Sequence, residues 1–161
     1  MNPDPASPRS PEASQVTMTE LVLPEDTNNY GQIFGGRVLA LADKCAAMAA
    51  MRHCRLPVVT ASFDRVDFLR PVKQGMIIIL TSEVNATFRT SLEVGVEVEA
   101  EDPITGLRVE TCRALITLVA IDATGRPVEV PPLEPTTSEQ RQRADRARER
   151  RKRRIASRDA F

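Results

Sequence analysis

Residues 26–43 contain polar side chains and glycines whose spacing suits chemistry on an acyl group. A polar loop with Asn28 leads to the pair Gly35-Gly36, and Asp43 follows within an apolar, alanine-rich stretch. Because a lone acid in such surroundings is costly to bury, it is expected to be paired or used in a reaction. The two glycines would open a helix, where backbone N–H groups stabilise a developing negative charge. This combination indicates acyl-group chemistry.

One long helix and five strands are expected to position these residues. The stretch from Gly35 or Gly36 to about His53 is apolar on nearly every side, which is typical of a helix enclosed by the rest of a protein. Strands are predicted over residues 17–23, 58–69, 76–86, 91–100 and 107–121, and 91–100 alternates as a half-buried antiparallel strand does. The order predicts an α+β fold in which one helix is wrapped by a curved antiparallel sheet. Open strand edges of that sheet are expected to pair across a dimer.

The chain divides by composition into three parts. Residues 1–15 are rich in Pro and Ser and predict a disordered arm. Residues 16–133 form the predicted folded domain. Residues 134–161 form a Pro-containing linker and a basic tail that is expected to be helical.

Charge is segregated along the chain, although the formal net charge is zero. Residues 1–140 have a net charge of −7 and residues 141–161 a net charge of +7. The tail is compatible with contact to nucleic acid, to an anionic membrane surface or to the acidic body of a neighbouring copy. The plainer interpretation is a solvated charged helix. Nucleic-acid contact is the weaker alternative, because no aromatic residue for base stacking precedes Phe161.

Several classes of protein are disfavoured by the sequence. No apolar run is long enough to span a bilayer and the N-terminus has no secretory apolar region, which predicts a cytoplasmic protein. Cys45, Cys54 and Cys112 have no metal or disulfide spacing, so no metal site is expected. A serine hydrolase is disfavoured because no G-x-S-x-G motif occurs. His53 is expected to lie near the helix C-terminus, where its charge would be favourable.

The ordered motifs resemble those of the hotdog-fold acyl-CoA thioesterases over about residues 17–133. The matching residues are Pro24-x-Asp26-Thr27-Asn28-x-x-Gly31-x-x-Phe34-Gly35-Gly36, then Asp43, Arg52-His53-Cys54, Val59-Thr60-Ala61-Ser62 and Phe68-x-x-Pro71-Val72-x-x-Gly75. The resemblance implies hydrolysis of acyl-CoA to a carboxylate and free CoA, without a metal or a cofactor, since CoA is part of the substrate. It also implies active sites at dimer interfaces and assembly of dimers into a hexamer.

Each candidate residue has a functional and a plainer interpretation. By resemblance Asp43 is the catalytic acid, acting as general base or nucleophile, and Asn28 reaches it from the other subunit. The plainer alternatives are an Asp43 that is paired with Lys44 or Arg37 or is simply exposed, and an Asx-turn or loop cap at Asn28. Thr60 is a candidate to contact the catalytic water or the thioester, or is an ordinary strand residue. Gly35 and Gly36 would hold the oxyanion through their N–H groups, or only permit a tight turn.

Cations are expected at the entrance of the site because CoA has three phosphates. The candidate contacts are Arg70, Lys73, Arg89, Thr90 and Ser91. Solvated surface charge is the plainer interpretation of these cations. The alternative function is an acyl-CoA-binding or sensing module of the same fold that hydrolyses little.

Overall fold

A computed structural model describes residues 7–158 of the chain. It contains two α-helices, five strands and two short 3-10 helices within that range. Their bounds, in chain order, are η1 Pro11–Ser14, β1 Val16–Leu21, η2 Pro24–Asp26, α1 Gly35–Cys54, β2 Val58–Phe68, β3 Ile77–Thr87, β4 Ser91–Glu101, β5 Arg108–Ala120 and α2 Ser138–Ala156.

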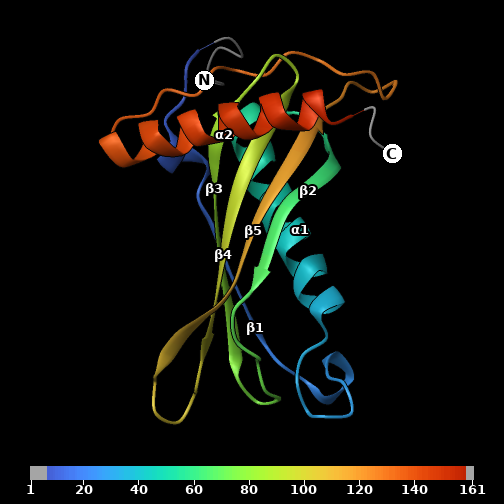
Figure 1. The fold of residues 1–161 in the computed structure, drawn as a ribbon, viewed down its shortest axis with the longest axis vertical. Coiled ribbons are helices and arrows are strands. Elements are labelled where there is room, and N and C mark those ends of the chain that lie inside the picture. Colours follow the sequence, from blue (N-terminus) through green and yellow to red (C-terminus); the bar gives the residue numbers. More distant parts are fainter. Residues whose placement is uncertain (1–6, 159–161) are drawn as a thin grey trace.

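The five strands form one antiparallel sheet with the order β1-β3-β4-β5-β2. Helix α1 packs on one face of the sheet, and α2 lies across the other face (Figure 1). Because β2 pairs only with β5, it forms an edge of the sheet. The molecule is therefore a three-layer arrangement in which the sheet separates two helices of different character.

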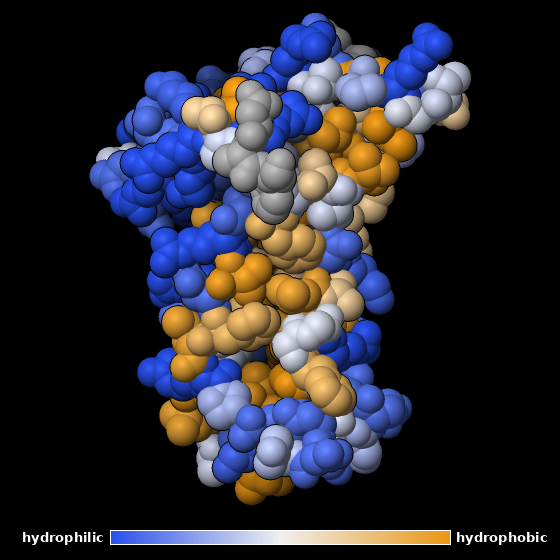
Figure 2. Space-filling model, turned by 45° about the vertical axis from the view of Figure 1, so that its right-hand side comes forward, coloured by the Kyte–Doolittle hydropathy of each residue, from blue (hydrophilic) through white to orange (hydrophobic). Residues whose placement is uncertain are grey.

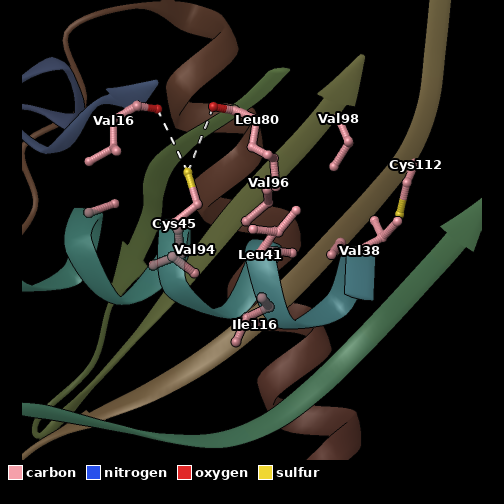
Figure 3. Close-up of a cluster of buried hydrophobic side chains, with 14 of the residues drawn as sticks. Val16, Val38, Leu41, Cys45, Leu80, Val94, Val96, Val98, Cys112 and Ile116 are labelled. Atoms are coloured by element: carbon pink, nitrogen blue, oxygen red, sulfur yellow. Dashed lines mark hydrogen bonds between the residues drawn. The ribbon is translucent and has the colours of Figure 1, made fainter. Parts of the chain in front are cut away.

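The core lies between α1 and the sheet. Leu41 and Cys45 of α1 point toward side chains of the four strands β1, β3, β4 and β5 (Figure 3). Small residues cover the buried face of α1 and let the strands approach the helix closely: Ala42, Cys45, Ala46, Ala49 and Ala50. The helix ends where Arg55 adopts a left-handed conformation with φ of 58° and Pro57 follows.

The predicted α+β architecture, with one long central helix and a curved antiparallel sheet, is confirmed. Strand and helix bounds differ from the predicted ones by one or two residues, mostly at strand ends where polar residues give no alternation to follow. In β4 the predicted alternation holds for Leu92, Val94, Val96 and Val98, which are all buried against α1. Glu93, on the opposite face, is also buried because α2 covers it.

The prediction of a disordered arm over residues 1–15 is wrong for residues 7–15, and residues 1–6 lie outside the described part of the chain. Pro11 and Ser14 of η1 are buried. The Ser14 hydroxyl accepts a hydrogen bond from Val84 N at 2.9 Å, and Glu12 accepts one from Gln140 of α2. The composition favoured disorder, but tertiary hydrogen bonds and burial order this segment.

The basic tail is not a solvated helix. Ala144 and Ala147 of α2 are buried on the outer face of the sheet. Three arginines of α2 reach carboxylates of three strands: Arg143 to Glu83 of β3, Arg150 to Glu93 of β4, and Arg154 to Asp64 of β2. Docking against an acidic surface was one of the predicted uses, and the surface is the sheet of the same chain rather than that of a neighbour. These pairs account for three of the positive charges of the tail.

Candidate active site

Asp43 lies half-buried on α1 and faces the beginning of β2. The Thr60 hydroxyl donates a hydrogen bond of 2.5 Å to Asp43 Oδ1. Arg37, considered above as an ion-pair partner, instead contacts Asp26 and Glu20, each at 2.9 Å. Within residues 7–158 no ion pair to Asp43 is found, so the ion-pair alternative for this acid loses its support.

A β-bulge in β2 aims Thr60 at Asp43. Thr60 pairs with Leu118 of β5, while Ser62 pairs with the next residue, Thr117, so Ala61 is an extra residue. Alternate residues of a regular strand share a face, and the bulge removes that relation between Thr60 and Ser62. Thr60 therefore faces α1 with the buried Leu118, and Ser62 faces the α2 side with Thr117.

The loop before α1 is closed by Asn28. Its side-chain oxygen accepts hydrogen bonds from the backbone N–H groups of Tyr30 at 2.9 Å and Gln32 at 3.2 Å. This is the Asx-turn given above as the plainer interpretation. It occupies the oxygen only, and among residues 7–158 the Asn28 amide nitrogen has no hydrogen-bond partner. Gly31 has φ of 70°, a conformation that favours glycine.

Gly35 and Gly36 form the first turn of α1, where N–H groups have no intrahelical partner. Neither glycine has a positive φ, so a tight turn does not require them. A Cβ on Gly35 would lie 3.3 Å from Phe68 Cζ, which accounts for glycine at that position. A Cβ on Gly36 would meet nothing within 4 Å. The packing of this chain thus gives no reason for glycine at position 36.

The five predicted CoA contacts lie at two ends of the sheet. Arg70 and Lys73 follow the end of β2. Arg70 lines a cleft of about 310 Å³ together with Gly35 and Phe68. Lys73 forms an isolated β-bridge with Gln32 of the loop that contains Asn28. Arg89 and Thr90 lie in the β3–β4 turn at the opposite end, and Ser91 begins β4. This end is level with the start of β2, because Ser91 and Val59 both pair with Val119. Figure 1 shows these two connections at opposite ends of the sheet.

The candidate residues therefore fall into two groups within one chain. The acid group consists of Asp43 and Thr60, near the β3–β4 turn. The loop group consists of Asn28, Gly35, Gly36, Arg70 and Lys73. Eight residues of helix separate Gly35 from Asp43, a distance of about 12 Å along the axis. A substrate carbonyl cannot contact both groups of a single copy.

Two groups of contacts were missed by the sequence reasoning. The contact of Phe68 with Gly35 joins the end of β2 to the start of α1. The cluster of Asp64, Thr117 and Arg154 joins β2, β5 and α2 on the outer face of the sheet. For the cluster around Asp64 the sequence offered one signal, because Asp64 interrupts the apolar alternation of β2.

Residues 7–158 contain no group of three or more His, Cys, Asp or Glu side chains placed to hold a metal ion. Activity without a metal or cofactor remains a prediction. No helix in the described part of the chain combines the length and apolarity needed to cross a bilayer.

Comparison with known proteins identifies the family. Residues 30–107 match the sequence profile described as the thioesterase superfamily. The chain is 42% identical over 127 residues to the uncharacterized acyl-CoA thioester hydrolase YkhA of Bacillus subtilis, covering 79% of this chain and 74% of that protein. The chain belongs to the thioesterase superfamily. It spans only 37% of the cytosolic acyl coenzyme A thioester hydrolase of Homo sapiens, with 32% identity.

Solved structures of thioesterases have the same fold. An apo-hexameric acyl-CoA thioesterase superposes with a TM-score of 0.91 and 41% identity, covering 96% of this chain and 99% of that chain. This likeness confirms the predicted hotdog fold.

An acyl-CoA hydrolase of Staphylococcus aureus, solved with butyryl coenzyme A, coenzyme A and coenzyme A disulfide, has a TM-score of 0.86 and 35% identity, covering 93% and 92% of the two chains. Variants of that hydrolase with alanine replacing an asparagine, an aspartate and a threonine are also solved. The residue types and numbers replaced in those variants are the same as those of Asn28, Asp43 and Thr60 in this chain.

Proposed function

We propose that this chain hydrolyses acyl-CoA thioesters, with Asp43 as the catalytic acid and the site assembled between two copies. The observation that carries the proposal is the contact of Thr60 with Asp43 Oδ1, which leaves Oδ2 for a water or a substrate carbonyl. The complexes of the similar Staphylococcus hydrolase with coenzyme A and butyryl coenzyme A support the substrate class.

The proposed reaction replaces the carbon–sulfur bond by a carbon–oxygen bond. Asp43 either takes a proton from water as the water attacks the thioester carbonyl, or attacks that carbonyl itself. The negative charge that forms on the carbonyl oxygen is met by the N–H groups of Gly35 and Gly36 at the start of α1. In the general-base route the carbon–sulfur bond then breaks, the CoA sulfur takes the proton that Asp43 removed from water, and the acyl group leaves as a carboxylic acid that releases its remaining proton to solvent. In the nucleophilic route Asp43 forms a mixed anhydride and CoA leaves as a thiolate. A water then hydrolyses the anhydride, which frees the carboxylate and restores Asp43, and the protons of that water go to the thiolate and to solvent.

Strand β2 is the proposed pairing edge between the copies. It has a partner on one side only, and it exposes the apolar side chains Val59, Phe63 and Phe68 by 47%, 38% and 55%. Figure 2 shows apolar side chains gathered along the middle of the side formed by β2 and α1. Exposed apolar side chains on an unpaired strand are typical of a surface covered by another chain.

Antiparallel pairing of two β2 strands would unite the two groups of site residues. The acid group lies near the start of β2 and the loop group near its end. A two-fold axis across β2 places the start of one strand beside the end of the other. Asp43 of one copy would then face Asn28 and Gly36 of its neighbour, and the two sets of CoA contacts would meet. The hexameric assembly of the similar thioesterase supports further association into a hexamer.

Release of free thiol from acyl-CoAs of increasing chain length tests the proposal, with wild type beside Asp43→Asn. We expect turnover by wild type and a loss of at least about a hundredfold in the variant, because the isosteric amide is a poor base and nucleophile. Asp145→Asn, an exposed acid on α2, is the matched control and should keep full activity. Calorimetry with CoA should show binding by all three proteins. Binding without turnover by wild type would instead indicate an acyl-CoA-binding module.

A further inference from the structure

A second bulge in β2 lies on the outer face of the sheet, away from the acid group. Phe63 pairs with Ile116 and Arg65 with Leu115, so Asp64 is an extra residue like Ala61. Two bulges within five residues leave this part of β2 without a regular ladder to hold its register. A shift of register by one residue would turn Thr60 away from Asp43. Contacts outside the ladder would therefore help to hold this segment in register.

The Asp64 carboxylate is held from three directions. It accepts hydrogen bonds from Ser62 of the same strand at 2.8 Å, from Thr117 of β5, and from Arg154 Nη1 of α2 at 2.8 and 2.9 Å. Burial acts to raise the pKa of Asp64, but the bonds from Thr117, Arg154 and Ser62 outweigh it and hold the pKa below its ordinary value. Asp64 is thus a charged anchor in the second bulge, three residues after the Ala61 bulge that aims Thr60.

Arg154 is the group that connects this anchor to α2. Its Nη1 also lies 2.6 Å from the Thr117 hydroxyl, so one nitrogen contacts both sides of the β2–β5 pair. We propose that Arg154 is a positioning residue of the active site, which fixes the bulged part of β2 through Asp64 and so directs Thr60 toward Asp43. This inference rests on the proposed function in so far as Thr60 and Asp43 serve hydrolysis.

Arg143 offers a matched control on the same helix. The side chains of Arg143 and Glu83 are 35% and 11% exposed, and those of Arg154 and Asp64 are 32% and 9% exposed. Both pairs join α2 to the sheet at similar depth, but Glu83 belongs to β3, which does not touch β2. Loss of Arg143 removes a comparable ion pair and leaves the Asp64 cluster in place.

Steady-state kinetics on an acyl-CoA substrate, with thermal melting, compare wild type, Arg154→Ala, Arg154→Lys and Arg143→Ala. We expect Arg154→Ala to lower kcat by about tenfold or more with KM nearly unchanged, because misplacing a reacting group costs mainly turnover. Arg143→Ala should lower the melting temperature to a similar extent and keep its kcat. Arg154→Lys should recover part of the kcat, since a single nitrogen makes the native contacts.

A double-variant cycle separates positioning from general stability. If Arg154 acts through Thr60, Thr60→Ala with Arg154→Ala should have the same kcat as Thr60→Ala alone. Effects that multiply would overturn the inference, as would equal kcat values for Arg154→Ala and Arg143→Ala. A kcat loss that disappears at higher protein concentration would overturn it too, because it would reflect weakened association.

Hydrogen exchange of the peptide covering residues 58–68 distinguishes failure of this inference from failure of the proposed function. Faster exchange in Arg154→Ala than in Arg143→Ala is expected whether or not the chain turns over acyl-CoA. Unchanged exchange with an active wild type would overturn the inference and leave the proposed function intact. An inactive wild type with faster exchange would reject the proposed function and retain the anchoring of β2 by Arg154.

Discussion

Individual residues of the candidate site differ in how far the fold itself requires them. Gly31 has a left-handed backbone and Gly35 lies against Phe68, so both are explained by local structure. Gly36 has neither constraint, although it lies at the helix N-terminus beside them. A residue that the fold leaves free, at a position suited to an oxyanion, is a direct test of the proposed chemistry.

Gly36→Ala should separate function from folding. Because a Cβ there meets nothing within 4 Å and alanine favours helix, we expect the melting temperature to stay the same or rise slightly. Turnover should fall by about tenfold or more, because the added methyl group would keep the thioester oxygen away from the N–H donors. Thiol release and thermal melting of the same preparation measure both effects. Full activity in Gly36→Ala would show that no group approaches this turn closely.

Helices α1 and α2 illustrate how elements are held to the sheet by different forces. Helix α1 buries alanines, Leu41 and Cys45 in an apolar core, whereas α2 combines two buried alanines with three arginine–carboxylate pairs. The C-terminal end of α1 has a third kind of contact. There His53 is fully buried, and its Nε2 lies 2.9 Å from the carbonyl oxygen of Pro131. The Arg9 side chain donates a hydrogen bond to the backbone carbonyl oxygen of His53.

The surroundings of His53 disfavour the charged form that its position at the helix terminus suggested. Burial lowers the pKa of His53, the bond to Pro131 opposes this in part, and nearby Arg9 lowers it further. The carbonyl oxygen of Pro131 only accepts, so Nε2 carries the proton, and the buried Nδ1 has no partner among the described residues. The folded protein therefore favours neutral His53.

The pH dependence of stability should reveal this neutral histidine. Below a pH of about 6.5 the unfolded chain binds a proton that the folded chain resists, so the free energy of unfolding falls as the pH decreases toward the folded pKa. His53→Gln keeps an amide donor near the Nε2 position and cannot titrate. The free energy of unfolding of this variant should depend less steeply on pH than that of wild type. The two slopes should differ by at most about 1.4 kcal/mol per pH unit. Urea unfolding at several pH values measures the slope, and identical slopes in both proteins would contradict the assignment.

For the whole molecule, the decisive feature is that one copy separates the acid group from the loop group. The proposed pairing of β2 strands makes each active site a shared product of two copies. A site shared between copies can be recognised by complementation between variants, which a site within one chain does not show. Two inactive variants, one defective in each group, should complement each other when their subunits mix.

Mixing Asn28→Ala with Asp43→Asn tests this sharing. Each variant alone should be nearly inactive. After dissociation and reassociation, about half of the dimers are mixed and each contains one intact site, so about a quarter of wild-type turnover should return. Thiol release before and after subunit exchange measures the recovery, and light scattering verifies the reassembled mass. No recovery despite verified exchange would place Asn28 and Asp43 at separate sites or within one copy.

Local patterns along the chain were enough to predict the strands, α1 and the reactive residue types. Alternation in β4 and the all-round apolar helix depend only on which side chains can be buried, and Asp43 is conspicuous because an acid is costly in such a helix. Three-dimensional contacts decided the rest. The two bulges of β2, the ordering of η1, the docking of α2 and the neutral state of His53 depend on partners 37 to 128 residues away along the chain. Such long-range contacts leave no periodic trace, because each joins single residues whose pairing is set only when the sheet has formed.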